Sequence, residues 1–221
     1  MRKTVIILSI LLFLASGCNP KTSSTSAQKA TFHNDTLLVN GLQLIETSNE
    51  EDTTQFFCLT TTKGDTIIPF ANYYSQMELL DINEDGSTDI RVFTFSNTDN
   101  QCNNYLFDKK DNIFRLIENC DLDIQKINGT DFYYSYVATT CGKMNWESDL
   151  NKIENYQLVT YGRIYGNACD SDYELTIKIY KISGEDELLI KTLPYKKYIL
   201  KFGDKWDFIK NYWETNYQNF E

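Results

Sequence analysis

The chain has 221 residues and a formal net charge of −10, because 31 aspartates and glutamates outnumber 21 lysines and arginines. Such a surface repels nucleic acid and anionic lipid, which excludes nucleic-acid binding and favours cations or basic proteins as partners. The length suffices for one domain with a sizeable core.

The N-terminal segment has the layout of a secretory signal. Arg2 and Lys3 precede an apolar run over residues 5–14, and small residues then lead directly to Cys18. The run is too short to span a bilayer as a mature helix. The segment resembles the lipobox of bacterial lipoproteins, which implies cleavage before Cys18 and lipidation of its thiol. The alternative is an ordinary signal with a coincidental cysteine.

This resemblance divides the chain into three parts. Residues 1–17 are expected to be a lipoprotein signal peptide, residues 18–30 a flexible tether rich in Ser, Thr and Lys, and residues 31–221 a single β-rich domain. Two or more acyl chains would hold the protein on a membrane. No acidic run resembling a Bacteroidetes surface-export signal follows Cys18. We therefore expect the periplasmic face of the outer membrane, with the cell surface as the alternative.

From residue 31 onward, short runs of β-branched and aromatic residues alternate with Gly, Asn and Asp, as at Asn40-Gly41. This spacing is typical of hairpins. The expected strand segments are residues 32–45, 55–62, 66–70, 77–82, 89–95, 104–108, 112–117, 132–139, 156–165, 173–182 and 188–192.

Two segments are expected to be helical. Ser148 would cap a short turn through Leu150 and Ile153. Asp204 would cap a helix over residues 205–217, where aromatic residues recur at helical spacing. Together the elements predict a mainly β fold, an antiparallel sandwich or barrel-like domain with a short C-terminal helix.

Five cysteines remain beyond Cys18, and an exported protein meets an oxidising compartment in which disulfides are expected. Cys102 and Cys120 flank the turn at residues 109–110 almost symmetrically, so they form the first predicted pair.

Cys141 and Cys169 form the second predicted pair, which leaves Cys58 as an inert buried thiol. Each disulfide would stabilise the fold by roughly 3 kcal/mol. Structural cysteines are expected rather than a zinc site or a Cys/His dyad, because the chain has no Cys-x-x-Cys pair and its one histidine is His33.

Residues 81–89, Asp-Ile-Asn-Glu-Asp-Gly-Ser-Thr-Asp, are the one segment with specific chemical content. Oxygen side chains occupy its first, third, fifth and ninth positions, and Gly86 permits a sharp reversal. Calcium takes about six to eight hard oxygen ligands, so this pattern predicts a Ca²⁺ site. The alternative is an acidic turn that binds nothing, because Asn, Asp and Gly also favour turns.

An EF-hand would continue to a glutamate at the twelfth position, where this chain has Val92. The segment instead resembles the shorter calcium loop of integrin-like FG-GAP repeats. That resemblance implies four side-chain ligands and one backbone carbonyl ligand. The side-chain ligands would be Asp81, Asn83, Asp85 and Asp89, and the carbonyl would be that of Ser87.

The motif order around the loop resembles that of small calcium-binding periplasmic proteins. The loop is followed by Ile90-Arg91-Val92, by residues 104–108 and by Phe114. Such proteins include immunity proteins that xanthomonads pair with peptidoglycan-cleaving effectors and that are akin to lysozyme inhibitors, and exported Bacteroidetes lipoproteins carry similar stretches. The resemblance covers about residues 77–117. It implies a β-rich fold, a structural calcium ion and inhibition of a cell-wall hydrolase by binding.

Two functions are therefore expected. A binding protein that inhibits a basic, lysozyme-like hydrolase, or confers immunity to it, fits the acidic surface. An accessory or structural envelope lipoprotein fits the same features. We do not expect an enzyme, because no two carboxylates can be matched as a catalytic pair.

Overall fold

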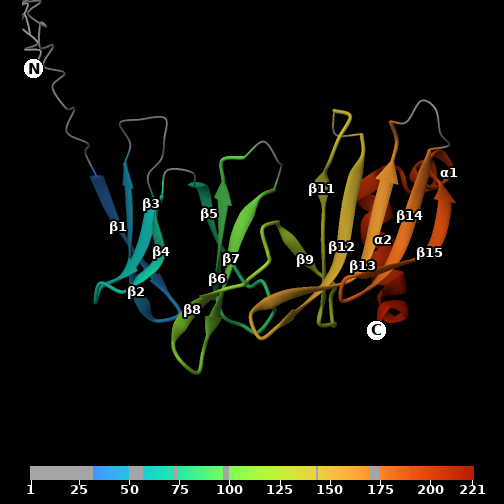
Figure 1. The fold of residues 1–221 in the computed structure, drawn as a ribbon. Helices are drawn as coiled ribbons and strands as arrows, with labels where there is room; N and C mark the ends of the chain where they lie inside the picture. The colour runs from blue at the N-terminus through green and yellow to red at the C-terminus, as the bar shows by residue number, and fades with distance from the viewer. Residues whose placement is uncertain (1–31, 50–56, 72–73, 97–99, 143, 170–174) are drawn as a thin grey trace, which may run out of the picture. The chain divides into compact units, whose positions relative to one another are not determined.

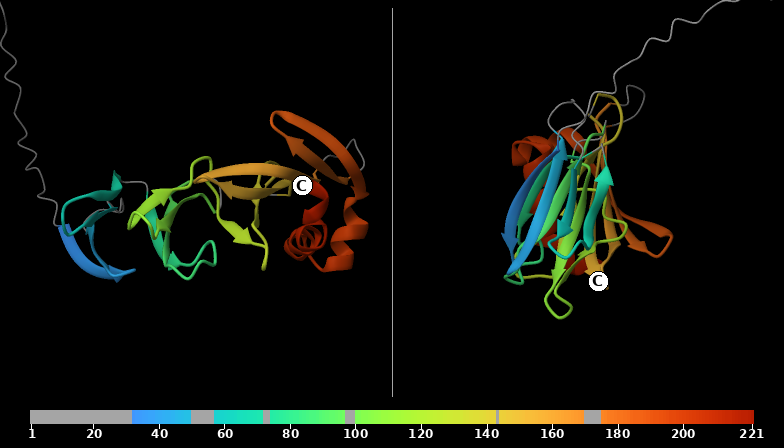
Figure 2. Two further views of the ribbon diagram at one scale, coloured as in Figure 1. Left: turned by 90° about the horizontal axis from the view of Figure 1, so that it is seen from below. Right: turned by 90° about the vertical axis from the view of Figure 1, so that its left-hand side faces the viewer.

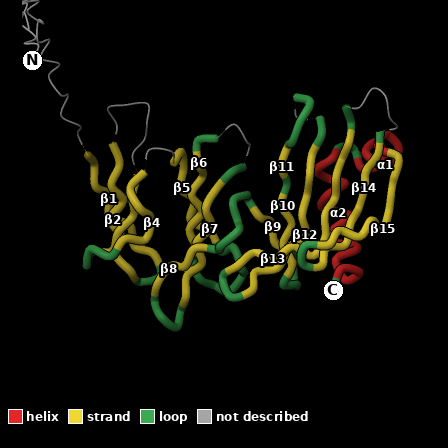
Figure 3. Tube along the Cα trace, viewed as in Figure 1, coloured by secondary structure: helices red, strands yellow, loops and turns green. Residues whose placement is uncertain are grey.

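The structure is a computed structural model, and it describes residues 32–49, 57–71, 74–96, 100–142, 144–169 and 175–221. The strands form three open antiparallel sheets, and both helices lie near the C-terminus (Figures 1 and 3). The predicted fold class, mainly β with a short C-terminal helix, is confirmed. No sheet closes into a barrel within the described residues.

The first sheet is a meander of four strands. Its first hairpin turns at Asn40 and Gly41, both with positive φ, as the sequence predicts. The strands are β1 (Phe32–Val39), β2 (Leu42–Asn49), β3 (Phe57–Thr61) and β4 (Thr66–Ala71).

The second sheet is another four-stranded meander, and its buried face shares a hydrophobic cluster with the first sheet. Leu44 and Leu59 of the first sheet lie in this cluster with Ile90, Val92 and Tyr105 of the second. The strands are β5 (Tyr74–Leu80), β6 (Asp89–Thr94), β7 (Cys102–Asp108) and β8 (Ile113–Leu116).

The third sheet has seven strands in the order β15-β14-β13-β12-β10-β9, with β11 paired to β12. The helices pack on one face of it (Figure 2), where Trp213 lies in the same core cluster as Trp146 and Ile164. The strands are β9 (Ile124–Lys126), β10 (Phe132–Ser135), β11 (Val137–Ala138), β12 (Trp146–Glu154), β13 (Gln157–Asn167), β14 (Thr176–Ser183) and β15 (Asp186–Pro194). The helices are α1 (Tyr195–Phe202), α2 (Lys205–Asn216) and the 3-10 turn η1 (Tyr217–Phe220).

Strand β15 is the edge strand of this sheet. It is exposed from Asp186 to Thr192, including Leu188 and Leu189. The pairing register with β14 shifts so that Ile190 has no partner, which is a β-bulge.

The two helix predictions have opposite outcomes. Asp204 caps α2, because its carboxylate accepts the backbone N–H of Asp207. The helix predicted from Ser148 through Ile153 is wrong, because these residues belong to β12. Buried and half-buried side chains alternate from Trp146 to Leu150, with Ser148 and Leu150 on the buried side.

Residues Thr31–Glu221 form one compact unit, and all three hydrophobic clusters lie within it. None of the helices in the described residues is long and apolar enough to cross a membrane.

Candidate functional site

The acidic loop joins β5 to β6 and curls around Asp81. The backbone N–H groups of Asp85 and Gly86 donate to the Asp81 carboxylate over 3.1 and 2.8 Å. Glu84 and Gly86 both have positive φ, 58° and 82°, which turns the chain sharply at these two points. The predicted loop therefore lies between two strands, as expected from the sequence.

Asn83 and Asp85 complete the curl. The Asp85 N–H also donates to Asn83 Oδ1 over 3.1 Å, so oxygens of Asn83 and Asp81 meet at the same amide. The Ser87 N–H donates to Asp85 Oδ1 over 2.8 Å, and Asn83 Nδ2 donates to Asp85 Oδ2 over 3.2 Å. Backbone and side-chain hydrogen bonds thus preorganise the oxygen atoms of the loop.

Asp89 ends the loop as the first residue of β6, and its side chain is completely buried. Its carboxylate accepts the backbone N–H of Ile82 over 2.9 Å and that of Phe107 over 2.8 Å. Burial raises the pKa of Asp89 to about 6, with the charges of Asp85 and Asp81 acting in the same direction and the two hydrogen bonds acting against it. A nearby cation would therefore favour the ionised form.

The donor chemistry of the loop fits calcium. Its predicted ligands are all oxygens, and two of them, the Asn83 amide and the Ser87 carbonyl, are neutral. Across the described ranges, no group of three His, Cys, Asp or Glu side chains is placed to hold a metal ion. Asp81, Asp85 and Asp89 therefore do not gather into such a group in the described residues, and calcium binding stays a prediction from the types of donor atom in the loop.

Two lysines that the sequence reasoning missed bring positive charge to the loop. Lys109 Nζ lies 3.2 Å from Asp85 Oδ1 and also donates to the Asp85 carbonyl. Lys126 Nζ donates to the Asn83 carbonyl over 2.5 Å. Burial opposes the ionisation of Asp85, but hydrogen bonds from Ser87 and Lys109 hold its pKa below the usual value.

A groove of about 710 Å³ opens beside the loop. The loop contributes Asn83 and Asp85 to its lining, and the β7–β8 turn, the β9–β10 region and the β12–β13 turn form the rest. Four lysines and four acids line it together with apolar and aromatic side chains such as Tyr133. The charged residues are Lys109, Lys110, Lys126, Lys152, Asp85, Asp108, Asp131 and Glu154. Segments up to about 70 residues apart meet here, which no local sequence pattern reveals.

The predicted Cys102–Cys120 disulfide is wrong, because both thiols are free and buried. The Asn104 side-chain amide donates to both sulfurs, over 3.5 Å to Cys102 and 3.2 Å to Cys120. Burial raises the pKa of each thiol to about 12, so both are protonated at neutral pH.

Arg91 lies on the other side of Asn104 and is buried. Its Nε donates to Asn104 Oδ1 over 2.8 Å, its second guanidinium nitrogen donates to the Ile124 carbonyl over 2.9 Å, and it forms an ion pair with Asp123. This network joins the second sheet to β9.

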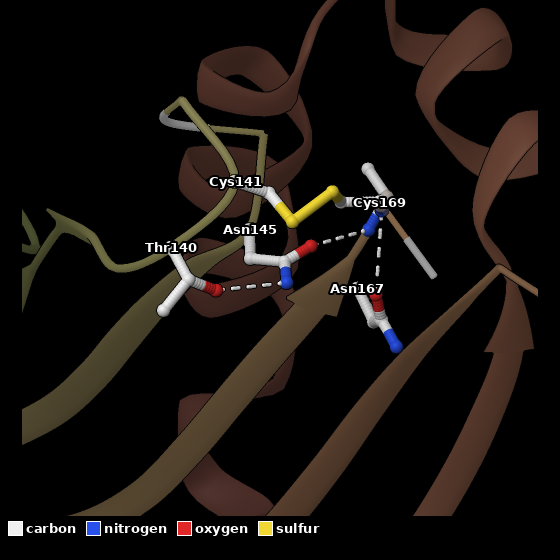
Figure 4. Close-up of a disulfide and its surroundings, with 6 residues drawn as sticks. Thr140, Cys141, Asn145, Asn167 and Cys169 are labelled. Carbon is white, nitrogen blue, oxygen red and sulfur yellow. Dashed lines mark hydrogen bonds between the residues drawn. A yellow bond between two sulfur atoms is a disulfide. The ribbon is translucent and has the colours of Figure 1, made fainter. Parts of the chain in front are cut away.

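The predicted Cys141–Cys169 disulfide is present (Figure 4). Asn145 supports it: its Oδ1 accepts the Ala168 N–H over 2.9 Å, and its Nδ2 donates to Thr140 over 3.0 Å. Cys58 is a free thiol as predicted, but it is half-buried rather than buried. Cys18 and the rest of the predicted signal and tether lie outside the described residues.

No protein-family model matches the chain, and no curated protein matches it. A solved structure described as "Structure of a Xanthomonas Type IV Secretion System related protein" is similar at a TM-score of 0.48 and 15% sequence identity. The match covers 72% of this chain and 93% of that chain. A likeness of this strength carries no inference about what this chain does.

Proposed function

We propose that the protein is an exported, lipid-anchored envelope protein that binds a basic partner at the groove beside the acidic loop. The observation that carries the proposal is the groove itself, in which Asp85 of the loop lies on the same surface as the exposed carboxylates of Asp131 and Glu154. The export and the lipid anchor rest on the N-terminal sequence, where small residues precede Cys18.

The partner class that we propose is a lysozyme-like cell-wall hydrolase. Support comes from the net charge of −10, which attracts a basic protein and speeds its association. Asp131 and Glu154 are exposed groove residues that would meet positive side chains of such a partner. Binding there would obstruct the hydrolase without any chemistry by this chain.

We further propose that the loop holds a structural calcium ion through the oxygens of Asp81, Asn83, Asp85 and Asp89 and the Ser87 carbonyl. A bound divalent ion would neutralise the carboxylates that otherwise repel one another across the loop. Lys109 now lies against Asp85, so the ion and the lysine would compete for this carboxylate.

Calcium titration by calorimetry on residues 19–221 tests the ion, with Asp85→Ala as the variant and Asp186→Asn as a matched exposed control. We expect one bound ion in the parent protein and the control and none in Asp85→Ala. Equal heats in all three proteins would show that the loop does not bind calcium and is only an acidic turn.

Inhibition of peptidoglycan lysis by a basic lysozyme-type muramidase tests the partner. The parent protein should slow the lysis, and the double variant Asp131→Asn/Glu154→Gln should need at least about tenfold more protein for the same effect. The double variant Glu185→Gln/Asp186→Asn in the exposed β14–β15 turn is the control and should inhibit like the parent. If the parent protein does not slow the lysis, the proposed hydrolase partner is wrong, and the alternative function is that of an accessory envelope lipoprotein.

A further inference from the structure

Helix α1 is amphipathic although none of its residues is fully buried. One side contributes Tyr198, Ile199 and Phe202 to the core of the seven-stranded sheet. The other side is exposed and carries Lys196, Lys197, Leu200 and Lys201. Leu200 is 80% exposed, so an apolar side chain stands among lysines on the outer surface of the helix.

The first turn of α2 also carries a lysine and an exposed apolar side chain, Lys205 and Trp206. Trp206 is 47% exposed and contacts Tyr136, with 3.8 Å between the two ring centroids. Lys205 Nζ lies 5.0 Å from the Tyr136 ring centroid and 5.5 Å from that of Trp206. An indole that is half in contact with protein and half open suits the boundary between water and lipid.

The charge of this segment is opposite to that of the whole chain. Residues 195–210 carry five lysines and two aspartates, a formal charge of +3, whereas the chain as a whole carries −10. The lysines are Lys196, Lys197, Lys201, Lys205 and Lys210. Salt screens charges beyond about 8 Å at physiological ionic strength, so the local lysines decide what this surface meets in close contact.

We propose that this basic helical surface, defined as Lys196, Lys197, Leu200, Lys201 and Trp206, docks on a bilayer that contains anionic phospholipid. The ammonium groups would contact lipid phosphates, while Leu200 and Trp206 would enter the headgroup region. Lysines around an exposed Leu and an exposed Trp match this two-part chemistry, because at a bilayer surface cations meet lipid phosphates while apolar and aromatic side chains enter the headgroup region. The surface is separate from the groove and does not depend on the partner proposed for it.

Co-sedimentation with vesicles tests the proposal on residues 19–221, which retain the whole compact unit Thr31–Glu221 but lack Cys18 and hence any lipid anchor. The vesicles contain phosphatidylcholine alone or with about one third phosphatidylglycerol. We expect binding to the anionic vesicles only, and its loss at about 0.5 M NaCl.

The triple variant Lys196→Gln/Lys197→Gln/Lys201→Gln should lower the partition coefficient about 100-fold, or roughly fivefold for each lysine. The control triple variant Lys63→Gln/Lys178→Gln/Lys191→Gln changes the net charge equally at exposed residues in the β3–β4 turn and on strands β14 and β15. Equal losses in the two triple variants, or equal binding to both kinds of vesicle, would overturn the proposal.

Tryptophan fluorescence separates entry into the headgroups from purely electrostatic contact. Trp146 and Trp213 are buried, so Trp206 is the indole that can report a change at the surface. Anionic vesicles should shift the emission to shorter wavelength, and Trp206→Phe should abolish the shift while leaving most of the binding. An unshifted spectrum with bound vesicles would overturn the proposed entry of Trp206.

Discussion

The helix-covered core of the third sheet and the junction around Arg91 are both buried, but different interactions hold them together. The core is built of aromatic and aliphatic side chains, with Trp146 and Trp213 fully enclosed. At the junction, Arg91 and Asn104 are buried among ion-pair and hydrogen-bond partners. The comparison teaches that close packing of side chains stabilises the first region, whereas ion pairs and hydrogen bonds stabilise the second. Different substitutions should therefore destabilise the two regions.

Arg91→Met should have the largest effect, a loss of about 3 kcal/mol in the free energy of unfolding, because it removes the ion pair of Asp123 and leaves the Asn104 side-chain oxygen and the Ile124 carbonyl without the arginine. Urea unfolding measures it. The double variant Arg91→Met/Asp123→Leu should recover part of the loss, since the stranded carboxylate is then gone. A single variant within about 1 kcal/mol of the parent would show that pairing does not control the junction.

Gly166→Ala should lower the free energy of unfolding by about 3 kcal/mol, because a Cβ at Gly166 would lie only 2.0 Å from a ring atom of the buried Trp146. Gly184→Ala is the control: its φ is +63° but nothing lies within 4 Å, so only about 1 kcal/mol of backbone strain is expected. Equal losses in the two variants would mean that the core adapts around Trp146 and is not controlled by shape.

Lys109→Met should tighten calcium binding about fivefold, since it removes the ammonium group that pairs with Asp85. Calorimetry measures the affinity, and Lys63→Met serves as a control for the lost surface charge. An unchanged affinity in Lys109→Met would show that the lysine and the ion do not compete.

The smallest expected effect is that of iodoacetamide on the native protein. The buried thiols of Cys102 and Cys120 should resist alkylation. With pKa values of about 12, only about one thiol in ten thousand is ionised at pH 8. Mass spectrometry should find Cys58 labelled first, and the two buried thiols labelled only after denaturation. Prompt labelling of either would mean that the junction opens readily.

The sequence predicted those features that depend on neighbouring residues. Asn40-Gly41 needs only its own backbone preference to form a hairpin turn, and Asp204 needs only the amide three residues later. The position of the acidic loop between two strands followed from the same kind of local pattern.

Features that depend on distant contacts were missed or misjudged. Ser148 looked like a helix cap, but its hydroxyl accepts the indole N–H of Trp213, which lies 65 residues further along. Helix α1 depends on packing against the sheet, and its short sequence gives no cap, because Pro194 precedes it without a side-chain hydrogen bond. Cys102 and Cys120 do lie near each other, but Asn104, which the sequence did not implicate, contacts both.

The bulge at Ile190 bears on whether strand β15 can pair with a strand of another chain. An exposed edge strand with Leu188, Leu189 and Ile190 in a row offers a row of backbone groups to which another chain could add, as in fibre growth. The extra residue bends the strand and breaks the regular spacing of those groups. Deleting Ile190 should straighten the edge, and we expect that variant to form fibres more readily than the parent protein.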